Sequence, residues 1–109
     1  MQIQNVPFTN IDWSAVNKTE HAGEKGVAFW QTKEIGTVRV RIVEYSKGYL
    51  ADHWCSKGHA ILVLEGDLVT ELQDGRRVEL KAGMGYVVAD GEVPHRSRTA
   101  TGAKLFIVD

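Results

Sequence analysis

Two histidines and the only cysteine of the chain lie close together in the stretch DHWCSKGH, residues 52–59. Imidazole and thiolate groups suit zinc, iron, nickel or copper better than magnesium or calcium. His53, Cys55 and His59 are therefore candidate metal ligands, and His95, distant in the sequence, is a fourth. If these side chains converge, we expect them to bind one divalent transition metal ion, such as zinc, iron or nickel.

The strands that carry these donors decide whether they can meet. Residues two apart in a strand share a face, so a strand over residues 50–55 would point His53 and Cys55 one way and Trp54 the other. Residues 56–58 are typical of a turn, after which His59 begins the next strand. His95 also begins a strand, directly after the loop DGEVP. The site thus needs a local cluster and one ligand from a distant strand.

Short apolar or alternating runs, separated by turns that contain glycine, make up nearly the whole chain. This pattern predicts an all-β fold, with about eight antiparallel strands closed into a barrel or jelly roll. Asp74 and Gly75 favour a tight hairpin turn, and only residues 12–18 favour a short helix. The expected strands are residues 26–35, 36–45, 50–55, 59–66, 67–72, 77–80, 86–89, 95–99 and 104–109.

Length and composition narrow the class of protein. A chain of 109 residues, 43% hydrophobic and 25% charged, fits one soluble globular domain, residues 1–109. The net charge of -1 leaves no basic excess for phosphates, so we expect no nucleic-acid partner. No apolar run or signal segment indicates a membrane partner. The single cysteine fits a reducing compartment, and we expect a cytoplasmic protein present at full length.

The donor segment resembles the first sequence motif of the cupins, a superfamily of small β-barrels, which reads G-x5-H-x-H-x3,4-E-x6-G. His53 and Gly66 match this motif, and Gly48 stands one residue too close to His53. Cys55 and His59 occupy the positions of the second histidine and the glutamate, and ILVLEGDL is very like the cupin YVLEGEL signature. A second motif, G-x5-P-x-G-x2-H-x3-N, is matched with departures by Gly83, Ala89, Gly91, His95 and Thr99. The chain is similar to an uncharacterised subgroup of small cupins named for an Asp-His-Cys-Trp type of motif.

The resemblance implies a cupin-type β-barrel, a double-stranded β-helix, with metal ligands at corresponding positions. His53 matches the first ligand, Cys55 stands at the second, His59 at the glutamate position and His95 at the last. The implied site has three histidines, with the Cys55 thiolate as an optional ligand. The missing glutamate removes one negative charge, which a coordinated thiolate would restore. Small cupins commonly pair, so the resemblance also implies a homodimer.

Cys55 has two other interpretations that stay open. It is alternatively a reactive thiol, activated by neighbouring His53, His59 and Lys57, or an inert buried side chain. Trp54 is expected outside the barrel, where a partner subunit would cover it.

Further residues are candidates for substrate binding. Tyr49 and Tyr86, like Tyr45, could reach the barrel interior and donate a hydrogen bond to a substrate, or pack with the hydroxyl at the surface. Arg41 shares a strand face with Arg39. If that face lines the barrel, Arg41 would clamp a substrate carboxylate; otherwise both arginines are solvated or lie at a subunit contact.

Three functions are compatible with these patterns. The first is a metal-dependent oxygenase or isomerase that acts on a small molecule at the histidine-rich site. The second is a sensor or storage module that binds a small ligand or a metal without chemistry of its own. The third is a purely structural or interaction domain. The number of metal ligands separates the first two, because structural sites lack an open position.

Overall fold

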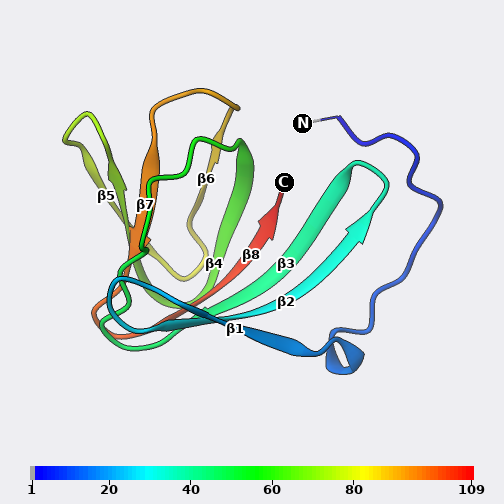
Figure 1. Cartoon of the computed structure of the whole chain (residues 1–109), viewed down its shortest axis with the longest axis horizontal. Coiled ribbons are helices and arrows are strands. Elements are labelled where there is room, and N and C mark those ends of the chain that lie inside the picture. Colours follow the sequence, from blue (N-terminus) through cyan, green and yellow to red (C-terminus); the bar gives the residue numbers. More distant parts are fainter. Residues whose placement is uncertain (1) are drawn as a thin grey trace.

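The chain folds into antiparallel strands, shown in Figure 1 for a computed structural model that describes residues 2–109. A short 3-10 helix, η1, spans Trp13–Ala15. Within residues 2–109, no helix is long and apolar enough to cross a membrane. The predicted all-β fold is confirmed. The strands are β1 Lys18–Ala22, β2 Val27–Ile35, β3 Val38–Tyr45, β4 His59–Leu72, β5 Arg77–Lys81, β6 Gly85–Val88, β7 His95–Arg98 and β8 Ala103–Val108.

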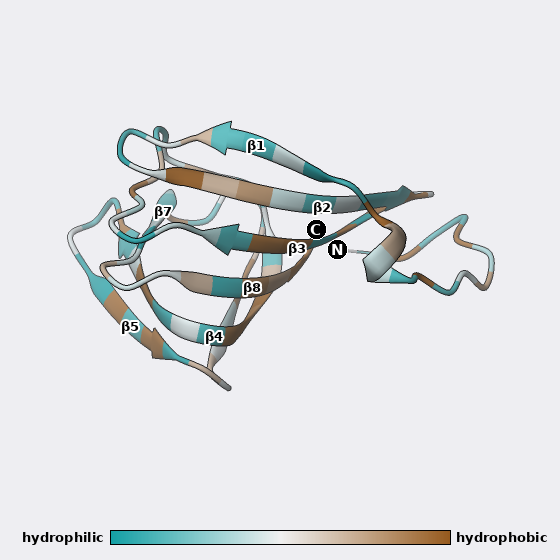
Figure 2. Ribbon diagram, turned by 90° about the horizontal axis from the view of Figure 1, so that it is seen from below, coloured by the Kyte–Doolittle hydropathy of each residue, from teal (hydrophilic) through white to brown (hydrophobic). Residues whose placement is uncertain are grey.

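Strand β4 belongs to both layers of the fold. Its first half pairs with β8 and β6, in a layer that continues through β3 and β2 to β1, whereas its second half pairs with β5 and β7 (Figure 2). The pairing shifts register between Val63 and Glu65, and Gly66 has a φ of 79°. A side chain at Gly66 would collide with the backbone of Gly102. The bulge and the glycine let one strand bend between the layers.

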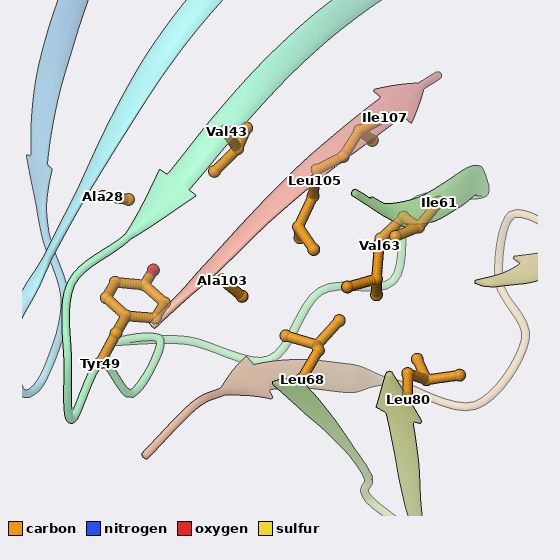
Figure 3. Packing of buried hydrophobic residues seen from close by; sticks show 10 residues of the cluster. All are labelled: Ala28, Val43, Tyr49, Ile61, Val63, Leu68, Leu80, Ala103, Leu105 and Ile107. Atoms are coloured by element: carbon orange, nitrogen blue, oxygen red, sulfur yellow. The ribbon is translucent and has the colours of Figure 1, made fainter. Parts of the chain in front are cut away.

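Apolar side chains from both layers meet between them to form the core (Figure 3). Leu105 on β8 is completely buried, and Val63 and Leu68 flank the bend of β4 at 1% exposure each. The bend is therefore fixed on its inner side by packing. The remaining members of the cluster are Ala28, Val43, Tyr49, Ile61, Leu80, Ala103 and Ile107.

Strand β3 turns its arginines toward the interior. Arg41 pairs with Ile107 of β8, a core residue, and Arg41 itself is 7% exposed. The expectation that Arg39 and Arg41 are solvated is therefore wrong for Arg41, and Arg39 is half-buried. Burial of these charges is stabilised by the Asp109 carboxylate, which lies 2.9 Å from Arg39 Nη2 and 3.1 Å from Arg41 Nη2.

Three segments differ from the sequence-based expectation. Residues 18–22, which lie outside the strands expected from the sequence, form the edge strand β1, where the half-buried His21 stacks on Trp30 with ring centroids 3.8 Å apart. Residues 50–55 do not form a strand. Only Leu50 and Cys55 make isolated bridges there, and the backbone bends at residues 52–53. The two predicted strands 59–66 and 67–72 are one continuous strand, β4.

We predict that Leu105→Ala lowers the free energy of unfolding by about 2–5 kcal/mol, because it leaves a cavity between the layers. Leu64→Ala is the matched control, since Leu64 is 40% exposed, and its loss should stay below about 1 kcal/mol. Urea denaturation followed by circular dichroism measures both. Equal losses would contradict the placement of the core.

Candidate metal centre

Three donor side chains meet at one end of the fold, where β4, β7 and the connection between β3 and β4 come together. His59 is the first residue of β4, His95 is the first residue of β7, and Cys55 lies in the connection. The backbone of Cys55 is bridged to His95 by N–H···O bonds of 2.7 and 3.0 Å. One ligand atom from each side chain lies within 4.8 Å of the others. Cys55 is half-buried and both histidines are buried.

The two imidazoles face each other directly. Their Nε2 atoms are 3.0 Å apart, with the ring planes inclined at 74°. His95 Nδ1 lies 3.1 Å from the carbonyl oxygen of Val93 and donates to it in the tautomer that leaves the Nε2 lone pair free. Such a bond orients a metal-binding histidine. The hydroxyl of Tyr86 lies 3.2 Å from His59 Nε2.

Burial keeps His59 uncharged. Desolvation, with repulsion from His95 as a smaller cause, lowers the pKa of His59 to about 4. His59 Nδ1 is buried and has no hydrogen-bond partner within the described residues, 2–109. A neutral imidazole is the form that binds a metal, so the site holds His59 ready as a ligand at neutral pH.

The donor set fits a divalent transition metal. Around tetrahedral zinc, nitrogen and sulfur ligands sit about 2.0–2.3 Å from the ion and hence roughly 3.3–3.7 Å from one another. The spacing of 3.0 Å between the imidazoles and the 4.8 Å limit for the set approach these values. Cys55, His59 and His95 can therefore hold an ion, and three protein ligands leave a coordination position open. Zinc, iron and nickel all accept such ligands.

His53 lies outside this cluster. Its side chain is 75% exposed, and its Nδ1 lies 2.6 Å from the Asp52 carboxylate. In a regular strand His53 would lie beside Cys55, because residues two apart share a face. The bend at residues 52–53 removes that regular alternation, so the geometry brings together three of the four predicted donors.

The three candidate substrate-binding residues have different surroundings. Tyr86 borders the cluster, and burial raises the pKa of its hydroxyl, which keeps it protonated. Tyr49 is 8% exposed and stacks on Tyr45 with ring centroids 4.2 Å apart, which is a packing position in the core. Arg41 is buried and binds Asp109. The buried position of Asp109 could not be predicted from the sequence, because a single acidic residue after a strand is usually exposed to solvent.

Two pockets adjoin the donors and share residues 87–89 in their linings. One, of about 380 Å³, reaches His95 and Tyr86 and is otherwise lined mostly by aliphatic side chains, among them Leu72, Val78 and Val93. The other, of about 650 Å³, reaches His59. A pocket with apolar walls and a few polar groups is typical of a small-molecule site.

We predict that metal-free protein loses stability as the pH falls from about 6.5 toward 4. The folded state keeps His59 neutral down to about pH 4, whereas the unfolded chain takes up its proton near pH 6.5, so protons favour unfolding in this window. The loss from this group is at most roughly 3 kcal/mol. Denaturant titrations of wild type and His59→Gln at pH 7.5 and 4.5 measure it. A pH dependence that is the same in both proteins would contradict the lowered pKa.

Comparisons with known proteins identify the fold. Neither a protein-family model nor a curated protein sequence matches the chain. Solved structures do match. A predicted oxalate decarboxylase from Thermotoga maritima has a TM-score of 0.76 at 15% identity, covering 92% of this chain and 96% of that one. The polyketide cyclase RemF from Streptomyces resistomycificus has a TM-score of 0.73 at 20% identity, covering 94% and 78%.

A third structure names the superfamily. It is a sugar phosphate isomerase from a cupin superfamily, from Silicibacter pomeroyi, with a TM-score of 0.72 at 15% identity, covering 92% of this chain and 74% of that one. Identities this low establish shared architecture and no shared activity. The two-layer fold, the bend of β4 and the donors at one end agree with the resemblance seen in the sequence motifs: the chain has the cupin fold.

Proposed function

We propose that this protein is a small metal-binding cupin and a metalloenzyme of the dioxygenase or isomerase type, acting on a small molecule. The observation that carries the proposal is the pair of buried imidazole nitrogens 3.0 Å apart with the Cys55 thiol beside them. The lone pairs of two neutral imidazole nitrogens this close together repel each other unless a proton or a cation lies between them. Solved structures with this fold, a sugar phosphate isomerase, a polyketide cyclase and a predicted oxalate decarboxylase, support an enzymatic role.

Each residue of the site has a defined part in this proposal. Cys55, His59 and His95 hold the ion, and the Val93 carbonyl keeps His95 in the binding tautomer. The metal supplies Lewis acidity, and an open position admits substrate. Tyr86 holds a proton beside His59 and is placed to donate it to a developing negative charge.

The pocket of about 380 Å³ supplies the space for the substrate. Aliphatic side chains make up most of its lining around His95 and Tyr86, and a less polar surrounding strengthens the hydrogen bonds made there. Arg76 and Glu92 lie at this pocket as well, and Arg76 is paired with Asp74 at 2.8 Å. The walls therefore favour a substrate with an apolar part.

A non-catalytic binding module is the second candidate, and the position of His53 is the observation that favours it. His53 is two residues from Cys55, in a segment with no ladder of strand hydrogen bonds to hold it away. If His53 turned inward as the fourth ligand, the coordination shell would close, as in structural zinc sites. The ligand count thus distinguishes an enzyme from a sensor or storage protein.

We predict one equivalent of metal per chain, measured by elemental analysis after dialysis against zinc, iron(II) or nickel. His59→Ala and His95→Ala should lose it, and Cys55→Ala should weaken binding about tenfold or more. His53→Ala should keep full stoichiometry, and His21→Ala, in β1, is the control. With cobalt in the site, a sulfur-to-metal charge-transfer band that is lost in Cys55→Ala reports the thiolate.

The outcomes of this series separate the candidates. Loss of metal in His53→Ala together with the other three variants supports the closed site and the non-catalytic module. Retention of metal in His53→Ala supports the open site of an enzyme. If wild type binds none of the three ions stoichiometrically, both the open site of an enzyme and the closed site of a binding module are contradicted.

We also propose that the protein forms a homodimer through the outer face of β4, β6 and β8. Leu62 is 41% and Val87 83% exposed there, and together with Phe106 they line an apolar hollow of about 310 Å³. Apolar faces of this kind are typical of subunit contacts. Trp54, by contrast, is partly covered within the chain by Arg96, whose guanidinium lies 4.5 Å from the ring centroid.

We predict that sedimentation velocity finds a dimer for wild type and a monomer for Val87→Lys, because a buried lysine without a partner charge is costly. Thr101→Lys, in an exposed turn, is the control and should stay dimeric. A wild-type monomer at concentrations of about 100 μM, where even weak dimers form, would contradict the dimer.

A further inference from the structure

Two arginines share one buried carboxylate beside the donor cluster. Arg39 makes two bonds to Asp109, from Nε to Oδ1 and from Nη2 to Oδ2, both 2.9 Å long. Arg41 makes one, from Nη2 to Oδ2, at 3.1 Å. The Asp109 side chain is 1% exposed and that of Arg41 is 9% exposed. One buried carboxylate thus serves two positive charges. The exposed Glu34, opposite Arg39 on β2, adds a negative charge near Arg39 only, so the excess positive charge belongs to Arg41.

Arg41 is incompletely satisfied in a second respect. Its Nε is buried and has no hydrogen-bond acceptor among residues 2–109. Its guanidinium lies 4.6 Å from the centroid of the Trp30 ring, which provides attraction but no hydrogen bond. Desolvation, helped by repulsion from Arg39, lowers the pKa of Arg41, although an arginine still remains charged at neutral pH. A buried donor and a buried charge without partners are both costly unless a ligand completes them.

The register of the strands places this excess charge next to the donors. Asp109 exchanges backbone bonds with Arg39 on β3, and the neighbouring Val108 pairs with Ala60 on β4. Asp109 therefore lies alongside His59, and the two residues line the same pocket of about 650 Å³. The other charged residues of that pocket, Lys57 and Asp90, cancel each other, and Asp90 already accepts the Gly58 N–H at 2.6 Å.

A metal ion would increase the imbalance. A divalent cation bound to one thiolate and two neutral imidazoles adds one net positive charge to the excess on Arg41. The Asp109 carboxylate cannot balance both, because Arg39 takes two of its bonds.

We propose that the site recognises a small molecule through a carboxylate group, which neutralises Arg41 and accepts a hydrogen bond from its Nε. This inference rests on the proposed function, since the carboxylate also balances the charge of the metal. A carboxylate fits better than a neutral polar group because charge is what the site lacks. It fits better than phosphate because phosphate, largely doubly charged at neutral pH, costs more to transfer from water into a buried site than a singly charged carboxylate.

Benzoate is a suitable probe, with benzamide as a neutral molecule of the same shape and inorganic phosphate as a different anion. Cobalt-loaded wild type is titrated with each, and the visible spectrum of the metal reports binding. We expect saturable binding of benzoate and much weaker binding of benzamide and phosphate. Arg41→Met should weaken benzoate binding about tenfold or more, the equivalent of one hydrogen bond to a charged group.

Arg98→Met is the matched control, because Arg98 lies on the outer side of β7 with 43% side-chain exposure. It removes the same charge and should change benzoate affinity less than about twofold, since an exposed charge is screened. Equal affinity for benzoate in Arg41→Met and wild type overturns the proposal. So does equal affinity of wild type for benzoate and benzamide, or for benzoate and phosphate.

A second measurement separates this inference from the metal site itself. The Nε–H resonance of Arg41, assigned in wild type by triple-resonance correlation with its side-chain carbons, is followed in metal-free wild type during benzoate titration. A saturable shift supports carboxylate recognition even if the metal analysis finds no ion, in which case only the metalloenzyme proposal falls. If this resonance does not shift and the cobalt spectrum shows no benzoate binding either, the inference is overturned. The proposed function still stands in that case, provided that the protein binds metal stoichiometrically. This measurement needs only wild-type folding, so an unstable Arg41→Met does not prevent a decision.

Discussion

The bend in β4 is the constraint on which the candidate site depends. His59 begins this strand, and Leu72, at its other end, pairs with His95. In a straight strand of 14 residues the two ends would lie about 40 Å apart, since each residue adds roughly 3.3 Å. The register shift after Val63 and the positive φ of Gly66 fold the strand so that its ends belong to facing layers. The imidazoles of His59 and His95 meet for that reason.

Packing and hydrogen bonds then hold what the bend brings together. Leu68 and Val63 fill the inside of the bend. On the far side, the backbone bridge between Cys55 and His95 ties the third donor to β7. The site is therefore assembled mainly by backbone geometry, with a carbonyl oxygen fixing one imidazole. Such rigid support is what a preorganised metal or substrate site requires.

The polar interior beside the donors has a different origin from the apolar core. Alternation along β3 places both Val43 and Arg41 inside, one in the core and one next to the site. The fold tolerates the arginine because Asp109, directly after β8, comes into register with β3. The charge of Arg41 is offset only in part. This incomplete balance distinguishes the donor end of the fold from the apolar core around Leu105 and Val43.

From the sequence alone, the class of fold and four candidate donors could be predicted, and three of these donors, Cys55, His59 and His95, do meet. Alternating runs and glycine-bearing turns depend on local stereochemistry, so they predicted most of the strands, and the motif spacing of His59 and His95 pointed to the cupin fold. The details of the site depended on tertiary contacts. Whether Arg41 faces inward, whether residues 50–55 extend as a strand and where His53 points all depend on pairing with distant partners. Periodicity gives the two faces of a strand but not which of them a remote strand will cover, because that choice is made by the register of the whole sheet.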